Sequence, residues 1–384
     1  MIRRDPTDEH VIQNSNSQSA RSNKRGRWLA KRLALAVFSI VIAMSIAEIG
    51  LRLFVEQELR RSAIYDRDLG WRGRPYANGL YVRRQDDIRT SFKYNNLGYR
   101  DEDVVARREG EEEIRVMLLG DSFLENLEVD YEHVFHKRLE EQLNANAPPK
   151  FSAVAIGSQG YSTAQELLAF RRFKDDVEPN IVVTVFYTGN DFEDNARPRF
   201  AYLNEQDEVV LPPNKESTLQ FQTRSMTRWI YESSHLVYLI KNQVQRLANV
   251  NLQDASKETG NVGDEELRKL TLGLLSQTKQ EVEAAGAVHG IIIIPSRDEL
   301  LAKDMTKVNL IANYCDERDV PHLNLANCLT PDGYFDVDVH FTVDGHERVS
   351  NEIATFLKSE FAEIVAPCFA TDSVANNDEP RYSH

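Results

Sequence analysis

The chain has 384 residues, of which 41% are hydrophobic, and a formal net charge of −14 at pH 7. The charge is uneven: residues 1–32 carry +5, so residues 33–384 carry −19. Such an acidic body repels phosphate backbones, which argues against nucleic acid as a partner. Three cysteines without metal-ligand spacing exclude a disulfide framework.

The first apolar element is a run of fifteen uncharged residues, Leu33–Ala47, directly preceded by a cluster of Lys and Arg. Extended to Val55, it forms a helix of roughly 34 Å, enough to cross a hydrocarbon core of roughly 30 Å. The extension includes Glu48 and Arg52, which lie four residues apart on one face and are able to pair.

We therefore predict a single-pass transmembrane signal anchor over residues 33–55. The basic residues before it keep segment 1–32 in the cytoplasm as a basic tail. Everything after about residue 55 is then extracytoplasmic, in the periplasm. A cleaved signal peptide and a buried helix of a soluble protein are the alternatives.

Turn formers and short aromatic runs fill residues 56–112, which predicts a linker and a small β-rich segment. From Ile114 the pattern changes to short, nearly continuous apolar runs, as buried parallel strands show. Four runs are clear and the last one is weaker: 114–119, 151–156, 181–187, 290–294 and 320–325.

Helical patterns alternate with these runs at about 131–145, 163–175, 264–286, 303–317 and 345–362. Alternation of strand and helix predicts an α/β domain over residues 113–365, with a parallel sheet covered by helices on both faces. An insertion over 192–263 follows the third strand, where ligand crevices form in open α/β sheets. Residues 366–384 lack an apolar period and are expected to form a flexible tail.

Gly120-Asp121-Ser122 closes the first strand, so Ser122 starts the loop into the next helix. A serine hydroxyl becomes a nucleophile when a neighbouring base removes its proton. The alternative role for Ser122 is that of a helix cap. The α/β-hydrolase elbow Gly-x-Ser-x-Gly occurs nowhere in the chain.

Two further blocks close the next two strands and offer donors for an oxyanion. Gly157 and Gly160 permit close approach of backbone N–H groups to a substrate, although they also suit an ordinary strand-to-helix turn. In Gly189-Asn190-Asp191, the amide of Asn190 is a candidate third donor. Its alternative role is in a turn that caps the inserted segment.

The candidate base is His340, with Asp338 as the carboxylate that orients it. His346 is a rival base, and His133 with His136 forms a weak metal candidate without a third ligand. The acidic run 336–340 lacks the glycine and the distal glutamate of a calcium-binding EF-hand loop. We expect no metal and no cofactor.

With these blocks in this order, the chain resembles the SGNH/GDSL hydrolase superfamily over residues 114–362, and its layout resembles the membrane-anchored bacterial type. Segment 94–100 (Tyr-Asn-Asn-Leu-Gly-Tyr-Arg) is similar to one that those proteins carry. The resemblance implies a three-layer α/β/α sandwich with a five-stranded parallel sheet. It also implies the following roles: catalytic Ser122, Asp338 and His340, and an oxyanion hole of the Ser122 N–H, Gly160 and Asn190.

The chain departs from the family pattern at three positions. The family often spaces its last block Asp-x-x-His, but Val337 occupies that position, so Asp338 takes the role and Asp336 is the reserve. Ala155 replaces the usual Asn of the second block, and Asn126 stands where a glycine is common.

The implied activity is that of a serine esterase or deacylase that removes small acyl groups, such as acetyl, from a glycan. An O-acyltransferase that modifies a polysaccharide with the same residues is one alternative. A non-catalytic, anchored glycan-binding or assembly protein is the other.

Overall fold

The computed structural model describes residues 7–55, 63–83, 85–107, 113–145, 150–251 and 264–366. Residues 56–62 of the segment expected as a linker and small β-rich region, and the tail beyond residue 366, lie outside the described residues. The chain forms two compact units: one joins residues 1–57 with 233–244, and the other joins residues 58–232 with 245–384.

The first unit is built on one long helix, α1 (Thr7–Phe54). Its stretch Lys31–Phe54 is long and apolar enough to cross a membrane. The helix begins well before residue 33, so the expected anchor is the C-terminal half of a longer element. The expected pair forms, with Arg52 Nε donating to Glu48 Oε1 at 2.7 Å.

Glu48 also holds the start of helix α7 (His235–Asn251), whose first residues belong to the same unit. Its carboxylate accepts hydrogen bonds from His235 N at 3.0 Å and Leu236 N at 2.9 Å. The first N–H groups of a helix lack intrahelical acceptors. Glu48 therefore serves as a capping carboxylate from a distant part of the chain, which accounts for an acidic residue in an apolar helix.

The second unit contains a five-stranded sheet in the order β11-β10-β7-β5-β6, in which every neighbouring pair is parallel. The predicted fold class is therefore confirmed. Its strands are β5 (Glu113–Gly120), β6 (Lys150–Gly157), β7 (Ile181–Tyr187), β10 (Val288–Ile294) and β11 (His322–Asn324).

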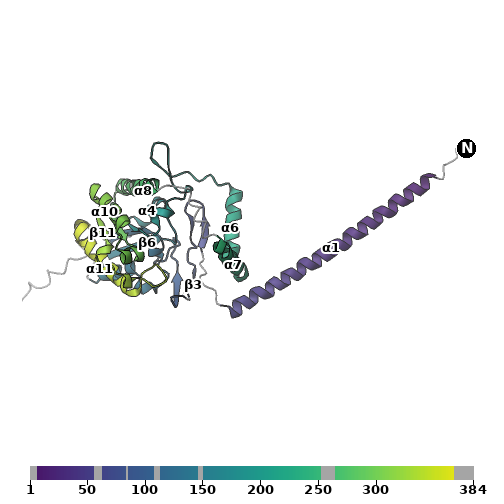
Figure 1. The fold of residues 1–384 in the computed structure, drawn as a ribbon, viewed down its shortest axis with the longest axis horizontal. Coiled ribbons are helices and arrows are strands. Elements are labelled where there is room, and N and C mark those ends of the chain that lie inside the picture. The colour runs from purple at the N-terminus through teal and green to yellow at the C-terminus, as the bar shows by residue number, and fades with distance from the viewer. Residues whose placement is uncertain are drawn as a thin grey trace, which may run out of the picture. The chain divides into compact units, whose positions relative to one another are not determined.

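Helices cover both faces of this sheet (Figure 1). Alternate strand residues point to opposite faces, so Val116 and Leu118 pack with α3 and α11, whereas Met117 and Leu119 pack with α4. The β10 side of that second face is covered by α8 and α10. The helices are α2 (Ser122–Glu125), α3 (Phe135–Leu143), α4 (Thr163–Val177), α5 (Asp191–Asp194), α8 (Asp264–Ala284), α9 (Arg297–Ala302), α10 (Thr306–Glu317), α11 (Val343–Glu360) and α12 (Ala362–Val365).

Two antiparallel hairpins precede the sheet in the chain, and they lie within the region expected to be β-rich. They pair β1 (Ala63–Asp66) with β2 (Gly70–Gly73), and β3 (Asn78–Arg83) with β4 (Ile88–Lys93). The insertion after β7 carries a short hairpin of β8 (Tyr202–Leu203) and β9 (Val209–Val210), followed by α6 (Thr218–Ser233) and α7. Three short 3₁₀ turns complete the described elements: Tyr131–His133, Leu325–Asn327 and Pro331–Gly333.

From β5 the chain first adds β6 on one side of the sheet, and then adds β7, β10 and β11 on the other side. The strand order therefore reverses between β5 and β7. In open α/β sheets a crevice forms at the carboxyl ends of the strands at such a switch point. Ser122 follows β5 and Asn190 follows β7. The topology therefore brings these two candidate site residues to the same edge of the sheet.

Candidate active site

Ser122 is the first residue of α2, directly after the carboxyl end of β5. Because it begins a helix, its N–H has no acceptor within that helix. The adjacent Asp121 caps α2 by accepting from Phe123 N at 2.9 Å, and Ser122 Oγ lies 3.4 Å from Asp121 Oδ2. Asp121, rather than Ser122, is thus the capping residue of α2, and the serine hydroxyl is hydrogen-bonded only to the carboxylate of that cap among the described residues.

The structure brings His340 and Asp338 into direct contact. Nδ1 of the His340 imidazole is hydrogen-bonded to Asp338 Oδ1, and the backbone N–H of His340 donates to the same oxygen at 2.9 Å. Both side chains are buried. Nε2 of His340 is buried without a hydrogen-bond partner among the described residues. The imidazole is therefore oriented at one nitrogen and available at the other.

The imidazole lies beside the element that carries Ser122. The ring centroids of His340 and Phe123, the residue after Ser122, are 4.9 Å apart. In this structure Ser122 Oγ is hydrogen-bonded to Asp121 and not to His340. Catalytic hydrogen bonds are often loose in the absence of substrate.

Two residues that sequence analysis missed complete the surroundings of this pair. Glu128, a buried side chain, places Oε1 3.4 Å from His340 Nδ1. Arg83, at the end of β3, places Nη1 2.5 Å from the second oxygen of Asp338. No spacing rule links residues 83, 128 and 338, so only the fold reveals this charge network.

These charges shift the pKa values of the pair. Burial by itself lowers the pKa of His340, but the Glu128 and Asp338 carboxylates outweigh it and raise that pKa to about 9. Burial opposes ionisation of Asp338, yet its contacts with His340 and Arg83 bring its pKa below the usual value. The orienting acid is thus ionised and the imidazole is strongly basic.

The two other expected donors also lie near this edge. Gly160 adopts a positive φ of 73°, and a side chain there would meet only Trp71, at 3.8 Å. Asn190 Nδ2 donates to Asp121 Oδ2 and to Asp194 Oδ2, both at 3.1 Å. The amide is therefore tied through Asp121 to the loop that carries Ser122, and it would have to release one carboxylate to donate to another group.

Segment 94–100 supports the loop after α2. The buried Arg100 guanidinium donates to the carbonyls of Asn126 and, at 2.8 Å, Val129. Tyr94 OH donates to Glu125 at 2.7 Å, and the other Glu125 oxygen accepts from Gln159 N at 2.7 Å. Residues 94–100 therefore help to fix both the helix of Ser122 and the chain just before Gly160.

Two of the positions noted as departures, Asn126 and Ala155, have the following surroundings. Asn126 ends α2 in the left-handed region, at φ 46° and ψ 52°, where glycine is the preferred residue and asparagine a common substitute. The backbone N–H of Ala155 is satisfied by Asp101 Oδ2 at 2.7 Å.

The alternative residues have different surroundings. The Asp336 side chain is 92% exposed and pairs with Arg297 at 2.9 Å, away from His340. His346 is buried and its Nδ1 accepts from Phe135 N at 3.3 Å, which is a structural contact. His136 is fully buried, and burial lowers its pKa to about 3.

Among the described residues, the group with metal-ligand geometry is Glu128, Asp338 and His340, whose ligand atoms lie within 4.8 Å of one another. The Asp338 oxygens already contact a guanidinium and an imidazole nitrogen. These contacts favour a proton, rather than an ion, between the carboxylates and His340 Nδ1. The residues thus suit general-base chemistry better than metal ligation.

No protein-family model matches the sequence, and no curated protein matches it either. Among solved structures, the chain is similar to a GDSL-like lipase from Bacteroides thetaiotaomicron, at 15% identity and a TM-score of 0.35, over 66% of this chain and 92% of that one. It is also similar to the esterase EstA from a Pseudoalteromonas species, at 10% identity and a TM-score of 0.38, over 65% and 98%. An acetylxylan esterase from Geobacillus stearothermophilus matches at 12% identity and a TM-score of 0.36, over 65% and 98%.

Likenesses of this size establish nothing about activity. The fold class is defined by the strand order.

Proposed function

We propose that the protein is an extracytoplasmic serine esterase of the SGNH type, which cleaves small acyl esters, such as acetyl groups, on a glycan. The observation that carries the proposal is His340: one imidazole nitrogen is held by Asp338, and the other is buried and unpartnered beside the helix of Ser122. A buried polar atom without a partner is costly. A serine hydroxyl that rotates toward it removes that cost.

In the proposed mechanism, the Ser122 side chain rotates away from Asp121 and brings Oγ to His340 Nε2. His340 Nε2 then takes the proton of the serine hydroxyl while Oγ attacks the ester carbonyl. The protonated imidazole is stabilised by Asp338 and Glu128. The N–H groups of Ser122 and Gly160, with the Asn190 amide, receive the developing oxyanion. His340 then protonates the leaving alcohol, and a water molecule activated by the same imidazole hydrolyses the acyl-enzyme.

The location belongs to the same proposal. The apolar stretch Lys31–Phe54 follows a basic flank, and such flanks remain in the cytoplasm. We propose that the helix anchors the protein in the cell membrane with residues 58–384 on the periplasmic side. Protease treatment of intact spheroplasts tests this orientation: the body is expected to be digested and residues 1–30 to be protected.

The experiment for the activity uses the full chain in detergent, with p-nitrophenyl acetate as substrate and a fluorophosphonate probe for an activated serine. We expect labelling and hydrolysis in the wild type and loss of both in Ser122→Ala. The matched control is Ser158→Ala, which removes a buried serine hydroxyl beside Gly157. Labelling that persists in Ser122→Ala excludes Ser122 as the nucleophile.

A further inference from the structure

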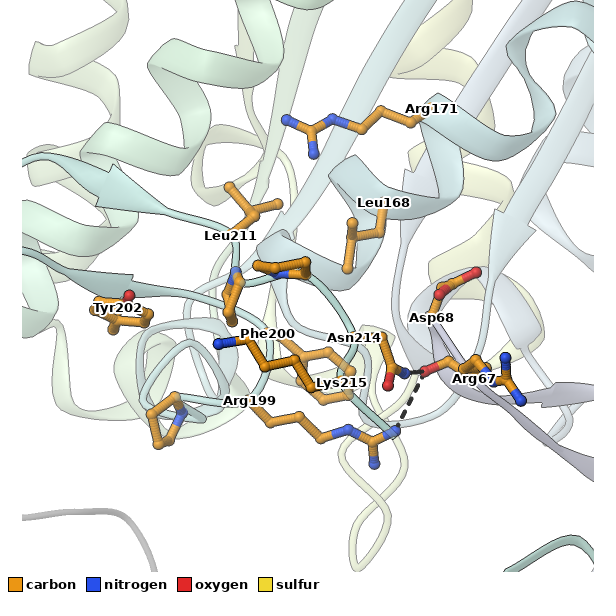
Figure 2. Close-up of a pocket in the computed structure, with 13 residues that line it drawn as sticks. Arg67, Asp68, Leu168, Arg171, Arg199, Phe200, Tyr202, Leu211, Asn214 and Lys215 are labelled. Carbon is orange, nitrogen blue, oxygen red and sulfur yellow. Dashed lines mark hydrogen bonds between the residues drawn. The ribbon is translucent and has the colours of Figure 1, made fainter. Parts of the chain in front are cut away.

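A surface cavity of about 530 Å³ lies outside the residues of the candidate site (Figure 2). Its walls come from α4, from the start of the insertion at residues 198–202 and 211–215, and from residues 67–68 of the β1–β2 turn. A volume of this size is within the range of small-ligand sites. The insertion, for which sequence analysis found no role, thus forms most of a pocket.

The charged side chains of this cavity are mostly basic. They comprise Arg67, Arg171, Arg199 and Lys215, against one acid, Asp68. Glu281 neutralises Arg171 through two hydrogen bonds, at 2.7 and 2.6 Å. Arg67, Arg199 and Lys215 have no carboxylate partner among the described residues. Three such cations against one acid in a single cavity stand out in a body that carries a net charge of −19.

Arg199 is held in place by contacts that leave its charge available. Its Nη2 donates to Tyr65 OH at 2.7 Å and lies 3.4 Å from the Arg67 carbonyl, as Figure 2 shows for the second contact. Its guanidinium also lies 5.2 Å from the centroid of the Phe200 ring. An arginine fixed in this way loses less freedom when it binds an anion.

The cavity is connected to the candidate active site by packed side chains. Phe200, which lines the cavity, packs edge-on against Trp71 with ring centroids 6.4 Å apart. Trp71 Nε1 donates to the carbonyl of Gln159 at 3.1 Å, one residue before Gly160. Arg197, two residues before Arg199, donates to the Gly160 carbonyl at 2.6 Å. The cavity wall and the second glycine block therefore form one packed region.

We propose that this cavity binds the acidic sugars of an anionic glycan, whose carboxylate or sulfate groups pair with Arg67, Arg199 and Lys215. The aromatic and proline side chains that also line the cavity offer apolar surface for sugar rings. The inference rests on the proposed function, which it extends by naming the charge class of the glycan that carries the ester.

Binding is measured with the full chain in detergent and two matched pairs of probes. Polygalacturonate is compared with its methyl-esterified form, and dextran sulfate with dextran. We expect the anionic member of at least one pair to bind at least tenfold more tightly, with affinity that falls as salt is added. Tighter binding of polygalacturonate than of its methyl ester identifies carboxylate as the bound group, and tighter binding of dextran sulfate than of dextran identifies sulfate. Equal binding of charged and uncharged members in both pairs overturns the proposal.

The variant that tests the site is Arg67→Gln with Arg199→Gln, and we expect it to weaken anionic binding about tenfold or more because two charge-assisted contacts are lost. The matched control, Arg268→Gln with Lys269→Gln, removes two cations from outside the cavity. The double change to lysine keeps the charge and is expected to retain most of the binding, which separates charge loss from misfolding. Equal weakening in the control and the cavity variant overturns the assignment.

Failure of this inference differs from failure of the proposed function. Ser122→Ala is expected to bind the anionic probe as the wild type does, since it leaves the cavity intact. If the wild type binds the probe but is not labelled by fluorophosphonate, the esterase proposal fails and the cavity stands as a glycan-binding site. If it is labelled but does not distinguish charged from uncharged glycans, the cavity assignment fails.

Discussion

Asp338 and Asp336 lie two residues apart in the chain but in opposite environments. The Asp338 carboxylate is buried against His340 and Arg83, whereas the Asp336 side chain is 92% exposed beside Arg297. A residue that orients a catalytic imidazole must contact its Nδ1 atom. Asp338 meets this condition and Asp336 does not.

We predict that Asp338→Asn lowers kcat for p-nitrophenyl acetate by about 10⁴, because an amide favours the wrong imidazole tautomer. Asp336→Asn is expected to change kcat by less than about threefold, since a surface ion pair contributes roughly 0–1 kcal/mol. Steady-state kinetics of the two variants provide the measurement. If Asp336→Asn loses more kcat than Asp338→Asn does, the assignment of Asp338 as the orienting carboxylate is wrong.

Glu128 gives the site an unusual feature, a second carboxylate near His340 Nδ1. The charges of Glu128 and Asp338 raise the pKa of His340 to about 9, and only the neutral imidazole accepts a proton from serine. We therefore predict that kcat/KM rises with pH and levels off above about pH 9.

Glu128→Gln removes one of these charges and is expected to move the midpoint of the kcat/KM profile down by about one pH unit. A purely structural role for Glu128 would lower the rate at all pH values without moving the midpoint. Glu132→Gln, on the neighbouring 3₁₀ turn, is the control and is expected to leave the midpoint in place.

The short helix α2 shows how a single element links Ser122 to the segment before the sheet. It starts at Ser122, and its C-cap is Asn126, whose carbonyl accepts from Arg100. Asn126 has a φ of 46°, and neither polar atom of its buried side chain has a hydrogen-bond partner among the described residues. Both features disfavour asparagine in comparison with glycine.

We predict that Asn126→Gly increases the free energy of unfolding by about 1 kcal/mol, because glycine adopts positive φ without strain and removes a buried unsatisfied amide. Asn126→Ala is the matched control: it removes the amide but keeps a Cβ at positive φ, so it is expected to be less stable than the glycine variant. Urea unfolding followed by circular dichroism measures both. A glycine variant less stable than the wild type contradicts the prediction.

The strands and helices of the sheet domain could be predicted because the hydrophobic pattern of each element depends only on residues close together in the sequence. The run at 181–187, for example, is a strand buried over its whole length. The positions of Ser122 and Asn190 could be predicted too, since each lies just after the end of a strand, and their roles stay predictions. The contacts of Arg83 and Glu128 could not be predicted, because Arg83 lies more than 200 residues away in the chain from Asp338, and Glu128 more than 200 from His340.

At the scale of the whole molecule, long-range contacts explain charges that local pattern leaves unexplained. Glu48 in the apolar helix was predicted to pair with Arg52, and it does, but its further role as the cap of α7 joins positions almost 190 residues apart. The cations of the cavity are likewise scattered over residues 67–215 and gather only in the fold. Composition indicates an acidic body, and only the structure locates its basic region.

The imidazole of His340 is also expected to link folding to pH. A group whose pKa is higher in the folded state than in the unfolded state stabilises the fold below its unfolded pKa and loses that contribution as pH rises through the folded value. For His340 these limits are about 6.5 and about 9. From pH 6.5 to above 9 the free energy of unfolding should therefore fall, by about 3 kcal/mol from this residue.

Activity and stability should thus change in opposite directions over this window, since deprotonation of His340 creates the base and removes the charge that Asp338 and Glu128 stabilise. Urea unfolding of the wild type and of His340→Gln, between pH 6 and pH 9.5, measures the effect. We expect the slope of unfolding free energy against pH to be much shallower in the variant. Equal slopes would mean that the two carboxylates do not hold a proton on this imidazole.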